Sequence, residues 1–247
     1  MSDDLPSDID ASIAAMRGQY ARLLQRLEAN EREFRRLGRA VWRVQEDERR
    51  RLARELHDGL GQNLTALKHR LGQIGSELPP GASALRDKLD TALALCAGAL
   101  DDTRNLSRLL RPPILDDLGL EPALRWLARS TEESAGLPVV LEIAALPALD
   151  DELQTLLFRI AQEAMNNAAK HAGARSLLLR LVLRDDRLQL QVIDDGSGFD
   201  ATTAAAAGGT GLGSMRERLR LYGGQLELRT APGQGTRLRA TVPLDAG

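Results

Sequence analysis

Aromatic residues are scarce in this sequence. They make up 3% of its 247 residues, and there is a single cysteine, Cys96. One cysteine excludes a disulfide framework within the chain and fits a reducing compartment. With so few rings, a core must be built from Leu, Ala, Val and Ile, which favours helical bundles over aromatic-rich sandwiches.

The sequence also lacks an excess of positive charge and a long apolar run. Its formal net charge is −2 at pH 7, whereas nucleic-acid binding usually needs a basic surface. No apolar stretch approaches the length that crosses a bilayer, and Met1–Asp4 is acidic where a secretory signal is basic. We therefore expect no direct nucleic-acid partner, no membrane segment and a cytoplasmic location. The soluble part of a longer membrane protein would look the same.

Residues 13–44 repeat apolar side chains in alternating steps of three and four. Such a seam predicts a left-handed coiled coil with a second helix. Asn30, its polar exception, is of the type that fixes register in a dimer. A lone amphipathic helix packed on its own domain is the alternative. The seam consists of Ile13, Met16, Tyr20, Leu23, Leu27, Asn30, Phe34, Leu37, Val41 and Val44.

A charged segment, residues 45–51, follows the seam. Within it, Glu46–Arg50 and Asp47–Arg51 have the i,i+4 spacing of ion pairs, with the acid first. This spacing is typical of a solvated helix face, so most of these charges are expected to face water.

The apolar pattern then resumes in a shifted phase over residues 52–74, and Pro79-Pro80-Gly81 ends the helix. A second apolar seam covers residues 85–110 and includes Cys96, which is expected to be a small buried residue. Two such helices form a hairpin, and one hairpin alone cannot bury the apolar side chains of both seams. Two hairpins from a homodimer make a four-helix bundle.

Arg111-Pro112-Pro113 breaks the helical pattern. After it, long helical seams give way to shorter helices and strand-like apolar runs. Residues 120–135 and 151–171 are expected to be helices. Short apolar runs with strand character lie at 138–143, 176–184, 187–193, 225–230 and 236–242. The C-terminal half is therefore predicted to be an α/β sandwich, with helices on one face of a mixed or antiparallel sheet.

His57 is the first candidate for chemistry, because its neutral imidazole is a good nucleophile toward phosphorus. The adjacent Asp58 can hold the imidazole tautomer and accept its proton. Gln62 lies one turn after Asp58 and can orient a water molecule. His69 is about 120° round an ideal helix from His57 and is expected to be a surface residue. A His–Asp pair on a helix is a weak signal by itself.

A second group of polar residues lies on the helix at 151–171. Glu163, Asn167 and His171 are spaced by four and form one stripe, with Lys170 beside it. The acid and the amide offer oxygen ligands for Mg²⁺, and the lysine offers charge to phosphates. A polar, solvated helix face is the alternative.

Two glycine-rich segments follow. Asp194-Asp195-Gly196-Ser197-Gly198 comes directly after a strand, and a carboxylate there can accept a hydrogen bond from the amine of adenine. Gly208–Met215 leads into a helix at Met215–Tyr222, as phosphate-binding loops do, and lacks the ending of a Walker A loop. Ala204–Ala207 before it is expected to be a lid. A plain glycine-rich turn is the alternative for the first segment.

Taken in order, these signals resemble sensor histidine kinases, in particular the nitrate-sensor and desaturase-sensor class. The resemblance covers about residues 46–243. The matching pieces are Arg54-Glu55-Leu56-His57-Asp58, Arg111–Leu120, Glu163 to His171, Asp194–Gly198 and Gly209–Arg218. It implies a multi-domain protein: a coiled coil at 1–45, a dimeric four-helix-bundle phosphoacceptor domain at 46–112, and an ATP-binding α/β domain of the gyrase, heat-shock-90 and histidine-kinase type at 113–247.

The resemblance also implies roles for single residues. His57 would be phosphorylated from ATP with Asp58 and Gln62 assisting, and the Asp58 to Gln62 spacing implies phosphatase activity. Asn167 and Glu163 would hold or position Mg²⁺. The expected nucleotide contacts are Asn167, Lys170, His171, Asp194, Gly196, Gly198, Gly209, Thr210, Gly211, Leu212 and Gly213. Glu163 is also an expected catalytic residue.

The implied partner is a response regulator, which receives the phosphoryl group on an Asp and usually carries a DNA-binding helix-turn-helix. Because the bundle and the ATP domain must meet, the linker Arg111–Asp117 is expected to act as a hinge. Two other functions remain open. One is a kinase for a Ser of another protein, as anti-sigma kinases are, and the other is a non-catalytic coiled-coil scaffold.

Overall fold

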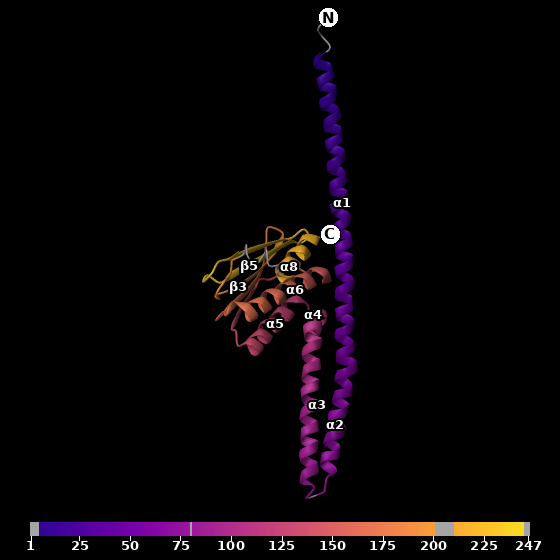
Figure 1. Ribbon diagram of the computed structural model, residues 1–247, viewed down its shortest axis with the longest axis vertical. Coiled ribbons are helices and arrows are strands. Elements are labelled where there is room, and N and C mark those ends of the chain that lie inside the picture. Colours follow the sequence, from indigo (N-terminus) through magenta and orange to yellow (C-terminus); the bar gives the residue numbers. More distant parts are fainter. Residues whose placement is uncertain (1–4, 80, 201–209, 245–247) are drawn as a thin grey trace.

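The computed structural model describes residues 5–79, 81–200 and 210–244. A long helical rod runs the length of the molecule, a hairpin forms its lower end, and an α/β unit lies beside it (Figure 1). The helices are α1 (Leu5–Glu55), η1 (Leu56–Gly61), α2 (Gln62–Glu77), α3 (Ser83–Leu110), α4 (Pro113–Leu118), α5 (Leu120–Ala135), α6 (Asp151–Asn167), η2 (Ala168–Ala172) and α8 (Thr210–Leu221). The strands are β1 (Val139–Ile143), β2 (Leu177–Arg184), β3 (Arg187–Asp194), β4 (Gln225–Thr230) and β5 (Thr236–Pro243).

The rod and the first arm of the hairpin are one continuous run of helix, and a second helix forms the other arm. α1 passes through the π-helical segment η1 into α2, which ends before Pro79 as predicted. α3 then returns antiparallel to it. Cys96 is buried, as expected, and its Sγ donates to the carbonyl of Leu64 at 3.3 Å. The Ser107 hydroxyl donates to the carbonyl of Ala53 at 2.9 Å. These two bonds fix the register of the hairpin.

The prediction of solvated charges after the seam is wrong for Glu46. This carboxylate is buried and accepts from the guanidinium of Arg159 on α6, with a closest distance of 2.7 Å. Arg50 instead pairs with Asp116 at 2.9 Å. The spacing of Glu46 and Arg50 was compatible with an i,i+4 pair, but the α/β unit covers this face of α1 and supplies a better partner.

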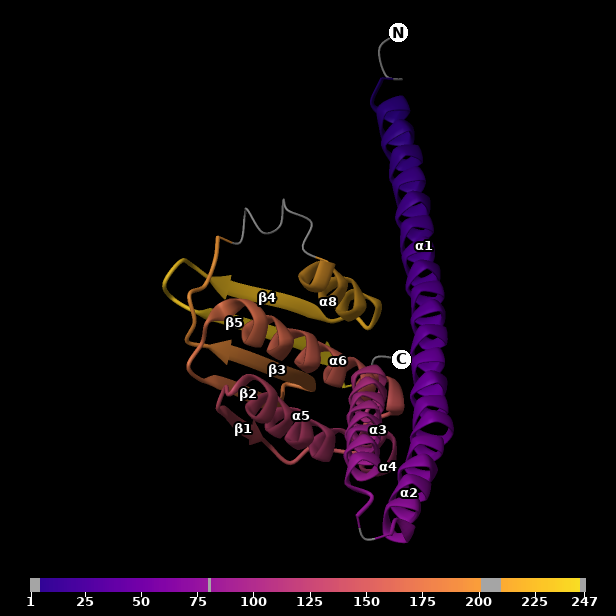
Figure 2. The same ribbon diagram turned by 60° about the horizontal axis from the view of Figure 1, so that its bottom comes forward.

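The α/β unit is a five-stranded mixed sheet with strand order β1-β2-β3-β5-β4. β1 pairs parallel to β2, and the other neighbours are antiparallel. α5, α6 and α8 cover one face of the sheet (Figure 2). The prediction of a sandwich with helices on one face is therefore confirmed. Phe158 and Leu190 are completely buried in this core, where apolar helix and sheet faces meet.

The linker between hairpin and α/β unit is ordered. α4, a short helix that the sequence pattern did not reveal, starts with Pro113, a residue suited to the first turn because its missing N–H needs no partner there. Arg111 is buried and donates to Asp116 at 2.8 Å and to Thr155 at 3.2 Å. The predicted hinge is thus held by ion pairs in this structure.

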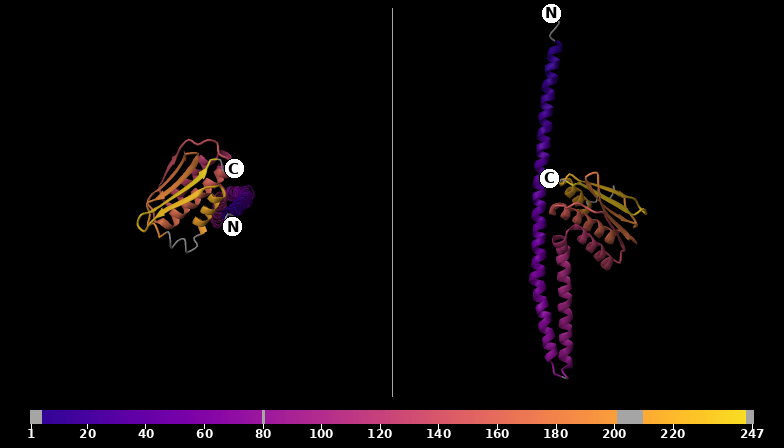
Figure 3. Two further views of the ribbon diagram at one scale, coloured as in Figure 1. Left: turned by 90° about the horizontal axis from the view of Figure 1, so that it is seen from above. Right: turned by 180° about the vertical axis from the view of Figure 1, so that it is seen from behind.

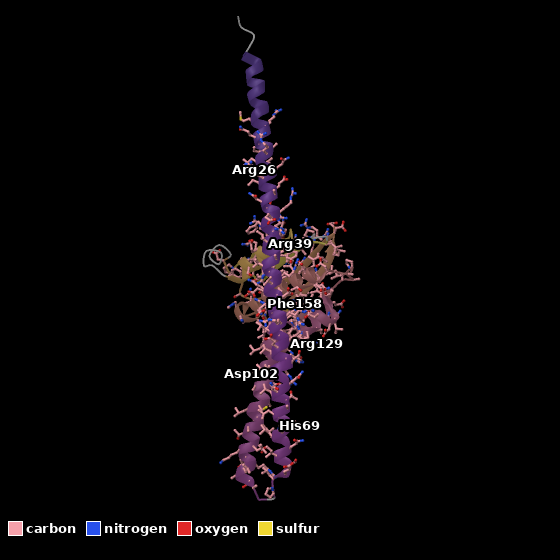
Figure 4. All side chains as sticks on the ribbon, turned by 90° about the vertical axis from the view of Figure 1, so that its right-hand side faces the viewer. Arg26, Arg39, His69, Asp102, Arg129 and Phe158 are labelled. Carbon is pink, nitrogen blue, oxygen red and sulfur yellow. The ribbon has the colours of Figure 1, made fainter. Side chains whose placement is uncertain are left out.

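The α/β unit packs directly on α1 (Figures 3 and 4). Trp42 is buried and meets Tyr222 edge-on, with 5.5 Å between ring centroids. Arg39 lies over the same Tyr222 ring, and its Nε donates to the carbonyl of Leu221 at 2.8 Å. These residues and Glu46 follow one another at helical spacing, so a single stripe of α1 holds the unit. Within the described ranges, no helix is long and apolar enough to span a membrane.

Candidate active site

The α/β unit encloses a cavity of about 470 Å³ between α6, the sheet and the start of α8. It is lined by Glu163, Ala164, Asn167, Ala168, His171, Ala172, Val192, Asp194, Gly198, Phe199, Gly211, Leu212, Leu228, Thr236 and Leu238. Most of the wall is apolar, with a few polar groups at defined points, as is usual for a small-molecule site. Three segments that are far apart in the sequence therefore meet at one place.

α6 brings the polar stripe to this cavity. Asp150 is the N-cap residue of the helix, and its Oδ1 accepts from the Leu153 N–H at 2.7 Å. Its apolar face is buried in the core, so the opposite stripe faces the cavity. After Asn167 the helix widens into the π-helical segment η2, a feature often found at functional sites.

Glu163 and Asn167 are in contact at one end of the cavity. The Asn167 amide nitrogen donates to Oε1 of Glu163 at 3.4 Å. The amide oxygen is therefore left as an acceptor beside a carboxylate, and these are the ligands that Mg²⁺ prefers. Within the described parts of the chain, three or more metal-binding side chains do not gather at any point. This donor set suits a Mg²⁺ ion that takes its other ligands from water and phosphates.

Gly211, at the start of α8, closes this end. A Cβ atom added there would lie 2.1 Å from Oε1 of Glu163 and 3.3 Å from Nδ2 of Asn167. Any side chain would therefore displace the carboxylate. Leu212 lines the cavity next to Gly211, whereas Gly213 is exposed. Thr210 begins the helix, and Gly209 and the predicted lid lie outside the described residues.

Asp194 lies at the other end of the cavity, where β3 ends. It is 9% exposed, and its Oδ1 accepts from the N–H of Gly196 at 2.9 Å and of Thr236 at 3.2 Å. These two bonds aim the carboxylate, and among the described residues none is seen to donate to its Oδ2, which can accept from a ligand. Glu163 and Ala172 mark the two ends on the helix, about 13 Å apart at 1.5 Å per residue. This span suits an extended nucleotide.

The segment after Asp194 is held by close backbone contacts. Gly198 has φ +57°, and a Cβ there would lie 2.1 Å from the carbonyl of Ala231, so a residue with a side chain does not fit. A Cβ added at Gly196 would lie 2.3 Å from the carbonyl of Ala172, which accepts from the Ser197 N–H at 2.7 Å. These predicted ligand-binding glycines thus join η2, β3 and the β4–β5 turn.

Asp195 has a structural role that the sequence analysis missed. Its Oδ1 accepts from the N–H groups of Ser176 at 2.9 Å and Arg175 at 2.7 Å. These hydrogen bonds hold the pKa of Asp195 below its usual value. They tie the end of β3 to the start of β2. A DxGxG pattern shows the two carboxylates side by side but not which one faces the ligand.

The remaining predicted residues of the stripe lie at the surface. His171 is exposed and lines the cavity, whereas Lys170 is exposed and, in the structure described, does not line it. A contact between Lys170 and phosphates would need its side chain to turn toward the cavity.

His57 lies away from the cavity, in a groove of about 410 Å³ on the hairpin. The groove is lined by His57, Gly61, Gln62, Thr65, Ala66, His69, Leu100, Thr103 and Arg104. His57 is exposed in the π-helical segment η1. Asp58 is also exposed, but it does not line the groove. Of the two residues predicted to assist His57, Gln62 lines the groove in the described structure and Asp58 does not.

His69 is exposed, as expected, and the labelled side chain lies on the hairpin well below the α/β unit (Figure 4). His57 and His69 both line the groove. The predicted offset of 120° assumed an ideal α-helix, whereas the stretch between the two residues includes the π-helical segment η1.

Comparison with known proteins identifies both regions. Residues 48–115 match the histidine kinase family model, and residues 152–246 match the model of histidine kinase-, DNA gyrase B- and HSP90-like ATPases. The chain belongs to the sensor histidine kinases of two-component systems. Its resemblance to the nitrate-sensor and desaturase-sensor class is thereby confirmed.

Two curated relatives are 37% identical to the chain. One is sensor histidine kinase MctS of Rhizobium johnstonii, matched over 82% of this chain and 44% of its own length. The other is signal transduction histidine-protein kinase/phosphatase UhpB of Salmonella typhimurium, matched over 84% of this chain and 41% of its own length. The chain thus spans less than half the length of these relatives.

Among solved structures, the chain is similar to the histidine kinase domain of a blue-light activated histidine kinase from Erythrobacter litoralis. The two are 18% identical, with a TM-score of 0.48 over 74% of this chain and 94% of the other.

Proposed function

We propose that this chain is the kinase part of a two-component sensor: it binds ATP with Mg²⁺ in the cavity and phosphorylates its own His57. One observation carries the proposal. The cavity places two Mg²⁺-type ligands, Glu163 and Asn167, at one end and a buried carboxylate, Asp194, at the other. This arrangement matches the two ends of a purine nucleoside triphosphate.

Each end has a definite task in this proposal. The free Oδ2 of Asp194 accepts a hydrogen bond from the exocyclic amine of adenine, which discriminates against guanine. Mg²⁺, when bound at Asn167 and Glu163, supplies charge neutralisation on the phosphates. The loop Gly209–Gly213 and Lys170 contact the phosphates, and Gly196 and Gly198 let the backbone approach the nucleotide.

The reaction is phosphoryl transfer to a ring nitrogen of His57. The nitrogen forms a bond to the γ-phosphorus while the bond to the bridging oxygen breaks and ADP leaves with that electron pair. Asp58 accepts the proton that the imidazole loses. The phosphoryl group then passes to an Asp carboxylate of a response regulator, and the imidazole regains a proton. Gln62 orients a water molecule for the phosphatase reaction, an activity named for the relative UhpB.

The cavity and the groove share no lining residue. In this proposal an α/β unit moves to bring its nucleotide to His57, within one chain or between the two chains of a dimer. The linker Arg111–Asp117 is the expected hinge, between a phosphoacceptor domain at 46–112 and an ATP-binding domain at 113–247. It would open after the ion pair between Arg111 and Asp116 breaks.

The chain is proposed to act as a homodimer. Large apolar side chains of the described part of the seam at 13–44, and of the hairpin, are exposed in the single chain, among them Leu23, Phe34, Val41, Leu60 and Leu106. A continuous apolar face of this extent marks an interaction site. A second copy would pair with α1 as a coiled coil and complete a four-helix bundle.

Incubation with γ-³²P-ATP tests the proposal. The wild-type chain should become labelled, and the label should be lost in acid and survive in alkali, as a phosphohistidine does. His57→Ala should remove the label. Persistent label in His57→Ala, or a label that survives acid, would favour a kinase for Ser. No binding of ATP–Mg²⁺ in calorimetry would favour the scaffold.

A further inference from the structure

The groove beside His57 has a second wall, formed by α3. The Ser107–Ala53 and Cys96–Leu64 hydrogen bonds lie on either side of the groove and define one antiparallel register. In that register Thr103 lies across from His57. Thr103 and its neighbour Arg104 line the groove together with His57.

Thr103 is not available to a ligand. It is buried, and its hydroxyl donates to the carbonyl of Ala99 at 2.8 Å. Arg104 differs from it. Its side chain is 49% exposed, and its ion pair with Asp101, one turn earlier on the same helix, has an N–O distance of 3.5 Å. An exposed pair of this kind contributes little, so the guanidinium is free to turn to another anion.

The groove must hold strong negative charge if His57 is phosphorylated, because the three terminal oxygens of a phosphoryl group share a charge of about −2. Among the described residues that line it, Arg104 is the one permanently charged cation. His69 also lines the groove, but its Nε2 lies 3.3 Å from the amide nitrogen of Gln73, which engages that side of the ring. A guanidinium binds phosphoryl oxygens through two parallel N–H groups.

We propose that Arg104 is a catalytic residue of the phosphoacceptor groove, where its guanidinium binds the phosphoryl oxygens as the group arrives at His57 and as it leaves. The proposal rests on the function proposed above. Arg104 neutralises the charge of the transferring group in both steps and neither gains nor loses a proton. The hairpin thus supplies its own phosphate-binding group, independent of the Mg²⁺ site in the α/β unit.

Two phosphoryl donors test this role on the full chain. ATP–Mg²⁺ requires the α/β unit, whereas phosphoramidate is a small donor that reaches His57 from solution. We expect Arg104→Ala and Arg104→Gln to lower the rate of His57 phosphorylation about tenfold with both donors, a loss smaller than that of a buried donor because water screens the groove. Arg104→Lys should retain part of the rate, since lysine keeps the positive charge but lacks the two parallel N–H groups of the guanidinium.

Arg108→Ala is the matched control, because Arg108 is exposed one turn further along α3 and does not line the groove. It should react like the wild type. Asn167→Ala should lose phosphorylation by ATP and keep phosphorylation by phosphoramidate. Thermal melting and sedimentation of each variant report on folding and dimerisation.

The outcomes separate the two proposals. Loss with both donors in the Arg104 variants, and in no control, supports a contact with the phosphoryl group. Loss with ATP alone would place Arg104 in the approach of the α/β unit and overturn the inference. Equal rates for Arg104→Ala and Arg108→Ala would overturn it while His57 phosphorylation stands. A wild-type chain that neither donor phosphorylates on His57 would overturn both proposals.

Discussion

Asn167 and its neighbour Asn166 have the same chemistry and different positions. The Asn167 amide contacts Glu163 in the cavity, whereas Asn166 does not line it. Asn167→Ala should weaken binding of a non-hydrolysable ATP analogue with Mg²⁺ at least about 100-fold, because a direct metal ligand is lost. Calorimetry measures this affinity.

Asn166→Ala is the control and should bind like the wild type. Without Mg²⁺, in the presence of a chelator, the Asn167 variant and the wild type should bind the analogue equally. A deficit that persists without Mg²⁺ would contradict the role of Asn167 as a metal ligand.

Asp195 makes stability depend on pH. Its two backbone hydrogen bonds lower its folded pKa from an unfolded value near 3.8, so the folded state binds fewer protons than the unfolded state at acid pH. The stabilisation is present above the unfolded pKa and is lost as the pH falls through the folded pKa. Asp195→Asn, which can accept the same bonds without charge, should therefore be less stable than the wild type at neutral pH.

Urea unfolding of both proteins at several pH values measures this effect. The difference in the free energy of unfolding should shrink below about pH 4. A difference that stays constant down to pH 3 would show that the charge of Asp195 does not contribute.

At the scale of elements, α1 presents two opposite faces. Leu37 and Val41 belong to the apolar seam and are 53% and 60% exposed in the single chain, whereas Arg39 and Trp42 hold the α/β unit. The two sets lie on different sides of one helix because heptad positions divide its surface. A partner helix and the α/β unit can therefore occupy α1 at the same time.

Val41→Asp tests the seam. Burying a carboxylate in the coiled coil should cost about 3 kcal/mol or more, which is roughly a 100-fold increase in the dissociation constant of the dimer. Analytical ultracentrifugation measures this constant. Arg32→Asp, on the opposite side of the helix, should dimerise like the wild type, and equal dimerisation of both variants would exclude the predicted seam.

At the scale of the whole molecule, a buried charge network joins the rod, the linker and the α/β unit. Arg159 is 2% exposed and is held by Glu46 and by the carbonyl of Leu110, while Arg111 lies 3.5 Å from the same Glu46 carboxylate. Burial lowers the pKa of Arg159, although Glu46 opposes this effect. Removal of one partner from such a network leaves a buried charge without compensation, which strongly destabilises the folded state.

Glu46→Ala should therefore release the α/β unit from α1. Removal of one partner of a buried pair costs about 3–5 kcal/mol, so the docked arrangement should lose most of its population. Small-angle X-ray scattering should show a larger and more variable particle, and hydrogen exchange should increase around Tyr222. Asp47→Ala, at an exposed neighbouring position, is the control. An unchanged scattering profile for Glu46→Ala would contradict this role.

The sequence predicted the local elements and the residue classes of the site well. Apolar periodicity located the helices at 120–135 and 151–171 and every strand of the sheet, because period and turn residues are local properties. The spacing of Glu163 and Asn167 placed them on one stripe. It did not reveal the short helix α4, whose six residues are too few to show a period.

What the sequence by itself determined is the heptad seam of α1, the fold-back at Pro79 and the identity of the groups that meet in the cavity. Only the tertiary structure decided that Glu46 is buried, that Asp194 and not Asp195 faces the cavity, and that Arg104 shares a groove with His57. The Glu46–Arg159 contact joins residues 113 positions apart. Local periodicity carries no information about such a distance, because the contact forms only when whole elements pack.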